Sequence, residues 1–486
     1  MTLKKDFEKR ATWYVNRSSC IYPLDLKKGS DFAIAFLNYW KLKNKINSLN
    51  VNLRFFDNNG TLKHIYSESI TKDHYELKAS QIISESSFSG MVEIEFISNE
   101  NMRFAFPGIS GFYISPDKLI SAAHSAGRCF NSEEPRKKGV SEESNFVCKT
   151  SNNSSPFFSL FNSNLEKDKN PIIITLKDKR NKTINKKIIY NELKKPFSNK
   201  IFYIRDFFKT KDLLKSSFCT VTTSNYDVFP RMICGNYYKK MHHYEVTHSF
   251  PVQKNKKDYI SQHYLKDKHV EHVLFLPFVK SDTQDLTLRI FPTNLNVNCN
   301  AKLFVQNNLT KKMNYKGNFL IKTGKENFEY NVKKNEKFGF FTVRQKKIPA
   351  RINTSYIYKN GNKNGFSTDI ATGFKSIDYP MKKTHWASFF CNRFTESRIL
   401  IRRVNHYKTF KNSTGSITFY GKNFKKKLNL NLKPTDYKIF LFEKIYKIKH
   451  KNLKSYSWLA KFKKGSGIEI FWNVSGKDFI AGDHSF

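Results

Sequence analysis

Short runs of alternating apolar and polar residues dominate the chain, and sustained helical periodicity is hard to find. In Val51–Phe55 every second residue is apolar, which in a β-strand places the apolar side chains on one face. Asp57–Gly60 follows with residue types that tolerate positive φ in a tight turn. Comparable runs occur at Ile172–Leu176, Leu286–Ile290 and Gly415–Phe419. The pattern predicts an all-β chain of antiparallel strands joined by short turns.

A faint pattern of about 120 residues recurs four times along the chain. Each copy opens on an apolar run that ends at or near Asn: Phe36–Asn38, Leu160–Asn162, Leu276–Phe278 and Phe390–Asn392. Each copy closes on a short polar motif that contains His or Asp: Ala123–Ser125, Thr247–Ser249, Thr368–Ile370 and Asp483–Ser485. Because the openings and the closings keep nearly the same spacing, we interpret the pattern as a structural repeat.

The repeat and the alternation together predict a tandem array of about four antiparallel β-sandwiches, immunoglobulin-like or jelly-roll-like. A chain of 486 residues is too long for one core and has room for four such units. We expect an N-terminal extension that adds a strand to the first sandwich or to a neighbour, and three linkers between the units. The predicted ranges are 1–30 for the extension, 31–130 for repeat 1, 131–153 for a linker, 154–252 for repeat 2, 253–269 for a basic linker, 270–374 for repeat 3, 375–384 for a linker, and 385–486 for repeat 4.

The chain is strongly basic, with 85 Lys and Arg against 41 Asp and Glu and a formal net charge of +44. A field of this strength attracts polyanions such as acidic glycans, nucleic acid or an anionic membrane surface. A genome biased toward A and T is a second explanation, since it enriches Lys, Asn, Ile, Phe and Tyr through their codons. Charge therefore suggests an acidic partner without identifying it.

Cysteine usage and the N-terminal residues favour a cytoplasmic location. The seven cysteines are scattered and never stand at the two-residue spacing of a zinc or redox motif, so we expect reduced thiols. The first residues are charged and lack the apolar core of a signal peptide. No stretch approaches the eighteen or so apolar residues of a transmembrane helix.

The closing motifs carry the candidate metal ligands His124, His248, Asp369 and His484. If the four units surrounded a common axis, these side chains would converge as a first shell for zinc, iron or manganese. In a linear array they would lie far apart, and the motifs would be hydrogen-bonded strand ends. We expect no cofactor, with this divalent-metal site as the alternative.

A second histidine cluster lies at Met241–His248. In a strand, His243, Glu245 and Thr247 share one face, while His242 and His248 lie on the other. Imidazoles six residues apart on a strand are too distant to hold one ion together. We therefore expect hydrogen-bonded histidines at the surface here.

Lysines interleaved with aromatic residues are the candidate polyanion-binding positions. Such runs can stack on bases or sugars while the ammonium groups meet an anionic backbone, or they can form a solvated outer strand face. The candidate residues are Lys239, Lys240, Lys425, Lys426, Lys427, Lys447 and Lys449.

From the sequence we predict a non-catalytic binding or structural protein that engages an acidic glycan, or less favourably nucleic acid. The alternative is an enzyme, either metal-dependent through the repeated His and Asp positions or acting on saccharides through paired carboxylates. An enzyme would concentrate its unusual residues at one place, whereas a binding array would repeat one surface in every unit. The oligomeric state stays open.

Overall fold

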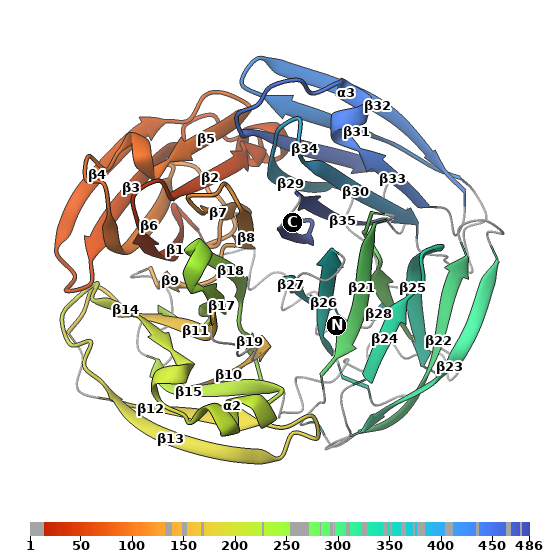
Figure 1. The fold of residues 1–486 in the computed structure, drawn as a ribbon. Coiled ribbons are helices and arrows are strands. Elements are labelled where there is room, and N and C mark those ends of the chain that lie inside the picture. The colour runs from red at the N-terminus through yellow and green to blue at the C-terminus, as the bar shows by residue number, and fades with distance from the viewer. Residues whose placement is uncertain are drawn as a thin grey trace.

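The computed structural model places four β-sandwiches in a closed ring (Figure 1). The structure describes residues 14–131, 139–147, 153–166, 170–225, 228–252, 272–281, 283–291, 295, 297–307, 312–322, 328–343, 348–349, 352–360, 366–372, 375–376, 384–403, 412–433, 437–462, 468–476 and 479–486. The predicted all-β class with about four tandem sandwich units is confirmed.

Unit 1 consists of two four-stranded antiparallel sheets. We call the sheet that contains the first strand of a unit its first sheet, and the other its second sheet. In unit 1 their orders are β1-β6-β3-β4 and β5-β2-β7-β8. The strands are β1 (Arg17–Leu26), β2 (Asp31–Leu37), β3 (Asn50–Asp57), β4 (Leu62–Ser69), β5 (His74–Lys78), β6 (Phe88–Ile97), β7 (Ser110–Ile114) and β8 (Ile120–His124).

The other three units repeat this strand order. Unit 2 contains β10 (Gly139–Val147), β11 (Ser154–Phe161), β12 (Asn170–Lys177), β13 (Thr183–Asn191), β14 (Asn199–Tyr203), β15 (Phe218–Asn225), β17 (Ile233–Tyr238) and β18 (His243–His248). Unit 3 contains β20 (His272–Pro277), β21 (Gln284–Ile290), β22 (Asn298–Asn307), β23 (Met313–Lys322), β24 (Phe328–Val332), β25 (Glu336–Val343), β26 (Ile352–Asn360) and β27 (Phe366–Thr372). Unit 4 contains β29 (Thr384–Cys391), β30 (Glu396–Arg403), β31 (Ser413–Gly421), β32 (Phe424–Leu432), β33 (Tyr437–Leu441), β34 (Lys454–Phe462), β35 (Ile468–Ser475) and β36 (Ile480–His484).

Short strands and single helical turns complete the described chain. The two-residue strands are β9 (Arg128–Cys129), which pairs with β16 (Val228–Phe229), β19 (Phe250–Pro251), which joins β10, and β28 (Lys375–Ser376), which joins β20. The helical segments are η1 (Trp40–Asn44), η2 (Ala79–Gln81), η3 (Ile204–Asp206), α2 (Thr210–Lys215), η4 (Lys239–Met241) and α3 (Phe442–Tyr446). Within the described ranges, no helix is long and apolar enough to cross a membrane.

Three strands lie outside the ranges expected for the repeats, namely β1, β10 and the two-residue β28. β1 falls within the expected extension and pairs along its whole length with β6, so the extension supplies the first strand of unit 1. β10 falls within the expected linker 131–153 and supplies the first strand of unit 2. The expected linker 253–269 lies outside the described residues, and the linker 375–384 includes β28 and the first residue of β29.

The opening motifs mark two different strands. Asn38 and Asn162 follow the second strands β2 and β11, whereas Phe278 and Asn392 follow the first strands β20 and β29. Both kinds of strand are apolar and buried, which is why the sequence pattern does not separate them. The closing motifs of units 1, 2 and 4 stand at equivalent positions, as shown below.

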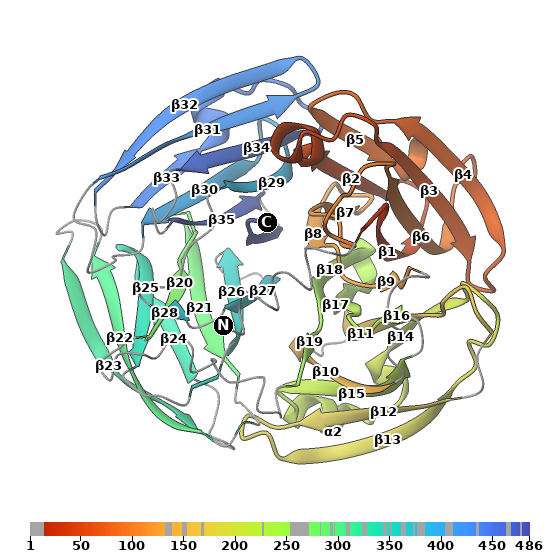
Figure 2. The ribbon, with the colours of Figure 1, turned by 180° about the vertical axis from the view of Figure 1, so that it is seen from behind.

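The second sheet of each unit faces the first sheet of a neighbour around the ring, as the two opposite views show (Figures 1 and 2). β2 and β5 of unit 1 lie against β34 of unit 4, and β14 of unit 2 lies against β1 and β6 of unit 1. Phe218 of unit 2 meets Phe291 of unit 3, and Leu400 and Phe471 of unit 4 join the core of unit 3. Head-to-tail contacts that close into a ring leave no sheet face at the end of an array.

The last strands of the four units meet at the ring axis. β8 lies beside β18 and β36, and β27 lies beside the same two strands. The strands β4, β13, β23 and β32 lie at the rim (Figure 1). Residues at the end of each repeat, more than a hundred positions apart in sequence, thus become neighbours.

Asparagines of the opening motifs fix nearby loops. The Asn162 side-chain amide donates to the carbonyls of Lys194 and Lys195 at 3.0 and 3.1 Å, and it is 1% exposed. Asn38 and Asn392 make the same kind of bond, to the carbonyls of Lys72 and Lys451.

We expect Asn162→Ala to lower the free energy of unfolding by about 1 to 3 kcal/mol, because it removes the buried amide that donates to part-buried loop carbonyls. Chemical denaturation measures this change. Asn392 reaches only one carbonyl and its bond is exposed, so Asn392→Ala should cost less. Equal losses in the two variants would contradict the assignment.

Candidate metal centre on the ring axis

The His-Ser pairs of three closing motifs stand at equivalent backbone positions. The amides of Ser125, Ser249 and Ser485 donate to the carbonyls of Ile109, Met232 and Ile470, the residues just before or within the neighbouring strands β7, β17 and β35. The three histidines before these serines therefore end β8, β18 and β36 in the same way. This shared geometry brings them to the axis from units 1, 2 and 4.

His124 is in contact with each of the other two histidines. The ring centre of His124 is 4.2 Å from that of His248 and 5.1 Å from that of His484. Asp483, one residue before His484, accepts a hydrogen bond from His124 Nδ1 at 2.5 Å. Ligand atoms of His124, Asp483 and His484 all lie within 4.8 Å of one another.

Each histidine has its Nδ1 beside an oxygen acceptor. For His248 and His484 the acceptor is the carbonyl of the following serine, at 2.8 and 2.9 Å. For His124 it is the Asp483 carboxylate. A proton on Nδ1 satisfies each of these bonds and leaves Nε2 unprotonated, which is the orientation that metal-bound histidines adopt.

The cluster is electrostatically coupled. Burial by itself would raise the pKa of Asp483, but the charges of His124 and His484 outweigh it and hold this pKa well below its usual range. Burial lowers the pKa of His248, and repulsion from His124 and Arg231 lowers it further. The Asp483 carboxylate is therefore ionised, which is the form that binds metal ions, and the neighbouring His248 is a neutral imidazole.

The centre is mostly enclosed by protein. The side chains of His124 and Asp483 are 9% and 12% exposed, while that of His484 is 39% exposed. His484 is thus the side of the cluster that solvent reaches.

Asp369, the fourth residue predicted for this centre, lies on β27 opposite Ser355. Its backbone belongs to the strand that lies beside β18 and β36. The position of its side chain is outside the described part of the structure.

Asp483 was not among the predicted ligands, although it lies in a predicted closing motif. The signal for it is local: an acidic residue stands directly before His484, where the equivalent residues of units 1 and 2 are Ala123 and Thr247. Its approach to His124 could not be deduced, because it depends on the contact between units 1 and 4.

The serines of the motifs hold further buried polar groups. Ser249 Oγ donates to Glu143 at 2.8 Å, and Ser485 Oγ bonds to His385 Nδ1 at 2.8 Å. Burial raises the pKa of Glu143 to about 8, against the opposing effects of Ser249 and Arg231. These contacts show that the expected strand-end hydrogen bonding occurs together with convergence on the axis.

The cluster at Met241–His248 is held by hydrogen bonds. His242, at a positive φ of 43°, bonds through its two ring nitrogens to the Tyr237 hydroxyl and the Asp25 carbonyl. The expected surface position is wrong for His243 and His248, which are 1% and 4% exposed. His243 is buried at the start of β18, and burial lowers its pKa to about 4. His242 and His243 belong to the contact between units 1 and 2 and to the core of unit 2, not to the axial cluster.

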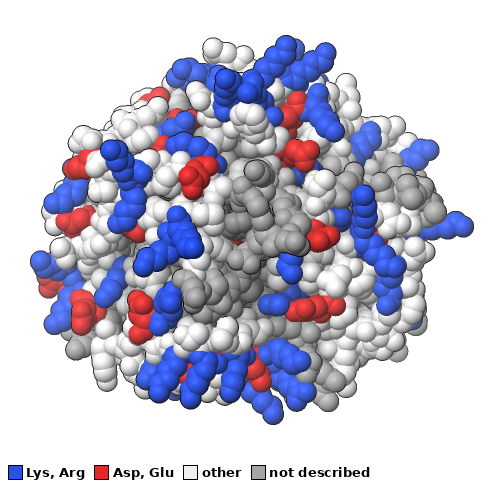
Figure 3. All heavy atoms as spheres, in the orientation of Figure 1, with Lys and Arg blue, Asp and Glu red and all other residues white. Residues whose placement is uncertain are grey.

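The predicted polyanion-binding lysines are exposed but do not form one cluster. Lys239 and Lys240 lie on η4 of unit 2, Lys425–Lys427 lie on β32, and Lys447 and Lys449 follow α3. On the face shown in Figure 3, Lys and Arg are spread over the periphery with Asp and Glu between them.

The aromatic residues of these runs are used inside the protein. Phe424 packs against Tyr446 with ring centres 5.1 Å apart, and Tyr237 stacks on Tyr244 at 4.5 Å. Tyr238 is buried and donates to Glu245. Binding of single-stranded nucleic acid relies on stacking of its bases on exposed aromatic rings. The aromatic rings at these positions already pack against other side chains, so they are not available for stacking.

The comparisons with known proteins leave the chain without a family. No family model and no curated protein matches it. One solved structure that was matched is described as a "Ca2+-stabilized adhesin" that "helps an Antarctic bacterium reach out and bind ice", with 8% identity, coverage of 97% of this chain and 99% of the other, and a TM-score of 0.11. A similarity this low carries no argument about function.

Proposed function

We propose that the protein binds one divalent transition-metal ion on the ring axis through His124, His484 and Asp483. The observation that supports this proposal is the convergence of ligand atoms from units 1 and 4 to within 4.8 Å of one another. Two imidazoles and a carboxylate suit zinc and similar ions, whereas calcium and magnesium favour all-oxygen sites.

The spacing of the rings agrees with a shared ion. When an imidazole nitrogen lies about 2.0 to 2.1 Å from zinc, two such rings on one ion have centres roughly 5 Å apart. His124 and His484 are 5.1 Å apart. His124 Nδ1 and Asp483 lie 2.5 Å apart in a hydrogen bond, so the two side chains would separate by roughly 1 Å to bind one ion side by side.

A bound ion would join unit 1 directly to unit 4. Since the two ligand strands β8 and β36 are the last strands of their units and lie side by side at the ring axis, the ion would strengthen the closure of the ring. Three protein ligands leave a fourth position for water or another ligand, so a catalytic role would require a substrate to reach the ion from the side of His484.

The test is elemental analysis of the purified full chain, followed by Zn²⁺ titration of the chelator-treated protein. We expect one ion per chain and its loss in His124→Ala, His484→Ala and Asp483→Asn. His64→Ala is the control, because His64 lies on the rim strand β4. Circular dichroism must show that the variants are folded. A wild-type protein that takes up no Zn²⁺, or variants that retain it, would refute the site.

We propose as a second function that the protein engages an acidic polymer through its basic surface. The net charge of +44 supports it, as does the exposure of the lysines on η4, on β32 and after α3. The engaged aromatic rings favour an acidic glycan over nucleic acid. Affinity for any polyanion should fall steeply with added salt, which a titration between low and physiological ionic strength measures.

A further inference from the structure

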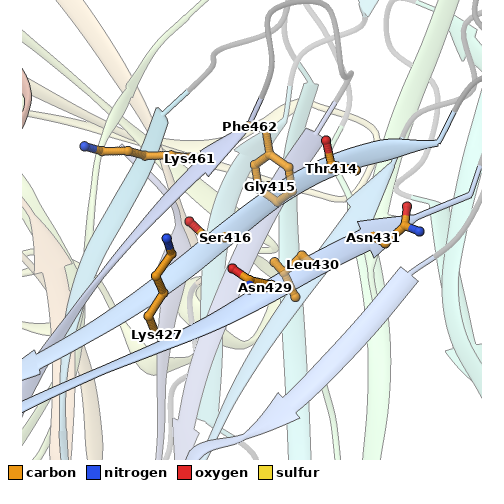
Figure 4. Close-up of a pocket in the computed structure, with 9 residues that line it drawn as sticks. All are labelled: Thr414, Gly415, Ser416, Lys427, Asn429, Leu430, Asn431, Lys461 and Phe462. Carbon is orange, nitrogen blue, oxygen red and sulfur yellow. The ribbon is translucent and has the colours of Figure 1, made fainter.

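The outer face of the first sheet of unit 4 holds a shallow depression lined by polar side chains (Figure 4). Thr414 and Ser416 come from β31, Asn429 and Asn431 from β32, and the ammonium groups of Lys427 and Lys461 from β32 and β34. We call these six residues the unit 4 platform. We propose that the platform binds a segment of an acidic polysaccharide, an inference that rests on the second proposed function.

The platform is regular because the strands are in register. Thr414 lies opposite Asn431, and Ser416 lies between Asn429 and Lys461. The intervening residues Gly415, Leu430 and Phe462 line the same depression, with the last two turned into the core. The alternation predicted for Gly415–Phe419 thus presents the polar residues together on one face.

The platform side chains make no hydrogen bond or ion pair with one another or with any other residue that the structure describes. The equivalent face of unit 1 is different: Ser67 bonds to Asn52 at 2.8 Å, and Ser69 bonds to Asn50 at 2.7 Å. These pairs occupy the ladder positions of Ser416–Asn429 and Thr414–Asn431. Ser and Asn side chains on this face are therefore hydrogen-bonded to each other in unit 1, whereas in unit 4 the corresponding polar side chains are available to bind a ligand.

The unit 4 platform also differs in charge from the equivalent face of unit 1. Glu95 lies opposite Asn52 in unit 1, and Lys461 lies opposite Ser416 at the equivalent position of unit 4. No carboxylate lines the depression among the described residues. Two ammonium groups without an acidic partner attract an anion, and ligand binding would relieve their mutual repulsion.

The polar groups select a sugar rather than a base. Hydroxyl and amide side chains both donate and accept, as sugar hydroxyls do, while Lys427 and Lys461 suit a carboxylate or sulfate group. The one aromatic residue at the site, Phe462, is 6% exposed and cannot stack on a ligand. The site therefore offers no exposed aromatic ring on which the bases of a nucleic acid could stack.

The experiment measures binding of a heparin hexasaccharide to the full chain by calorimetry at physiological salt. The platform variant is Lys427→Gln with Lys461→Gln, and the matched control is Lys186→Gln with Lys187→Gln on the rim strand β13 of unit 2. We expect the platform variant to bind at least tenfold more weakly and the control to change by less than about threefold. An added Asn429→Ala, which removes no charge, should weaken binding further.

Three outcomes would overturn the inference, and they differ in what else they affect. If the wild-type protein does not bind the hexasaccharide, both the acidic-polymer function and the binding role of the platform are refuted. If the platform and control variants lose affinity equally, only the binding role of the platform is refuted, because affinity would then depend on the total charge of the protein. Equal binding of a thymidine hexanucleotide, lost in the same platform variant, would assign the site to nucleic acid.

Discussion

Glu93→Ala is expected to lower the free energy of unfolding by about 3 to 5 kcal/mol, as removal of one partner from a buried ion network does. The Glu93 side chain is fully buried, and its two oxygens lie 2.7 Å from Arg17 and 2.5 Å from Arg54. Glu95 contacts the same two guanidinium groups. Without Glu93, two partly buried cations share one carboxylate.

The network also carries a contact between units. Arg54 lies over the ring of Phe197 of unit 2, with the guanidinium 5.4 Å from the ring centre. Burial, together with the neighbouring Glu95, raises the pKa of Glu93 against the attraction of Arg17 and Arg54. The ion pairs therefore compensate a large desolvation cost, and the loss of one member leaves that cost uncompensated.

Denaturant unfolding of the wild type, Glu93→Ala and the control Glu85→Ala measures the effect. The Glu85 side chain is 54% exposed in its pair with His64, so its removal should change the free energy of unfolding far less than removal of Glu93. The double variant Glu93→Ala with Arg54→Met should recover part of the loss, because it removes one uncompensated charge. A loss in Glu93→Ala no larger than in Glu85→Ala would contradict this account.

Acid is expected to weaken the junction between units 1 and 4 through His74. His74 Nδ1 and Nε2 lie 2.8 and 2.9 Å from the hydroxyls of Ser457 and Ser455 on β34. Ser455 donates to Glu76, so its oxygen accepts from Nε2, and Nδ1 accepts from Ser457. This arrangement fits a neutral imidazole, since protonation of Nδ1 would force the Ser457 hydroxyl to turn from donor to acceptor.

Burial lowers the pKa of His74 from 6.5 to about 4, although Glu76 and Ser455 act in the opposite direction. The folded state therefore binds this proton more weakly than the unfolded state. The stabilisation is complete above about pH 6.5 and is lost as the pH falls toward 4, by up to about 3 kcal/mol.

Comparison of unfolding free energies for the wild type and His74→Gln between pH 7.5 and 4 isolates this effect. At pH 7.5 the variant should be less stable, and toward pH 4 the difference should shrink by about 3 kcal/mol. Parallel pH profiles would show that His74 does not titrate in this way. His243 remains in both proteins, so its own acid response cancels in the comparison.

Local sequence patterns were sufficient to predict many of the strands but not their order in the sheets. Alternation at Val51–Phe55 predicts β3, in which Val51, Leu53 and Phe55 are buried, because strand geometry needs only neighbouring residues. The repeat predicted about four sandwiches, since each unit buries a core of its own. Strand identity was harder: β1 and β10 lie in ranges predicted as an extension and a linker, because pairing with β6 and β15 is not a local property.

The candidate sites depended on the tertiary structure. His124, His248 and His484 are recognisable as a repeated position, but their contact exists only because the four units close into a ring. Asp483, Glu93 and the Lys427–Lys461 pair gain their roles from partners in other strands or units. The sequence by itself determined the strands, their repetition and the positive charge, since these follow from residue type and order. Only the tertiary structure decided which charges are compensated, because compensation depends on distance between residues that the chain order leaves far apart.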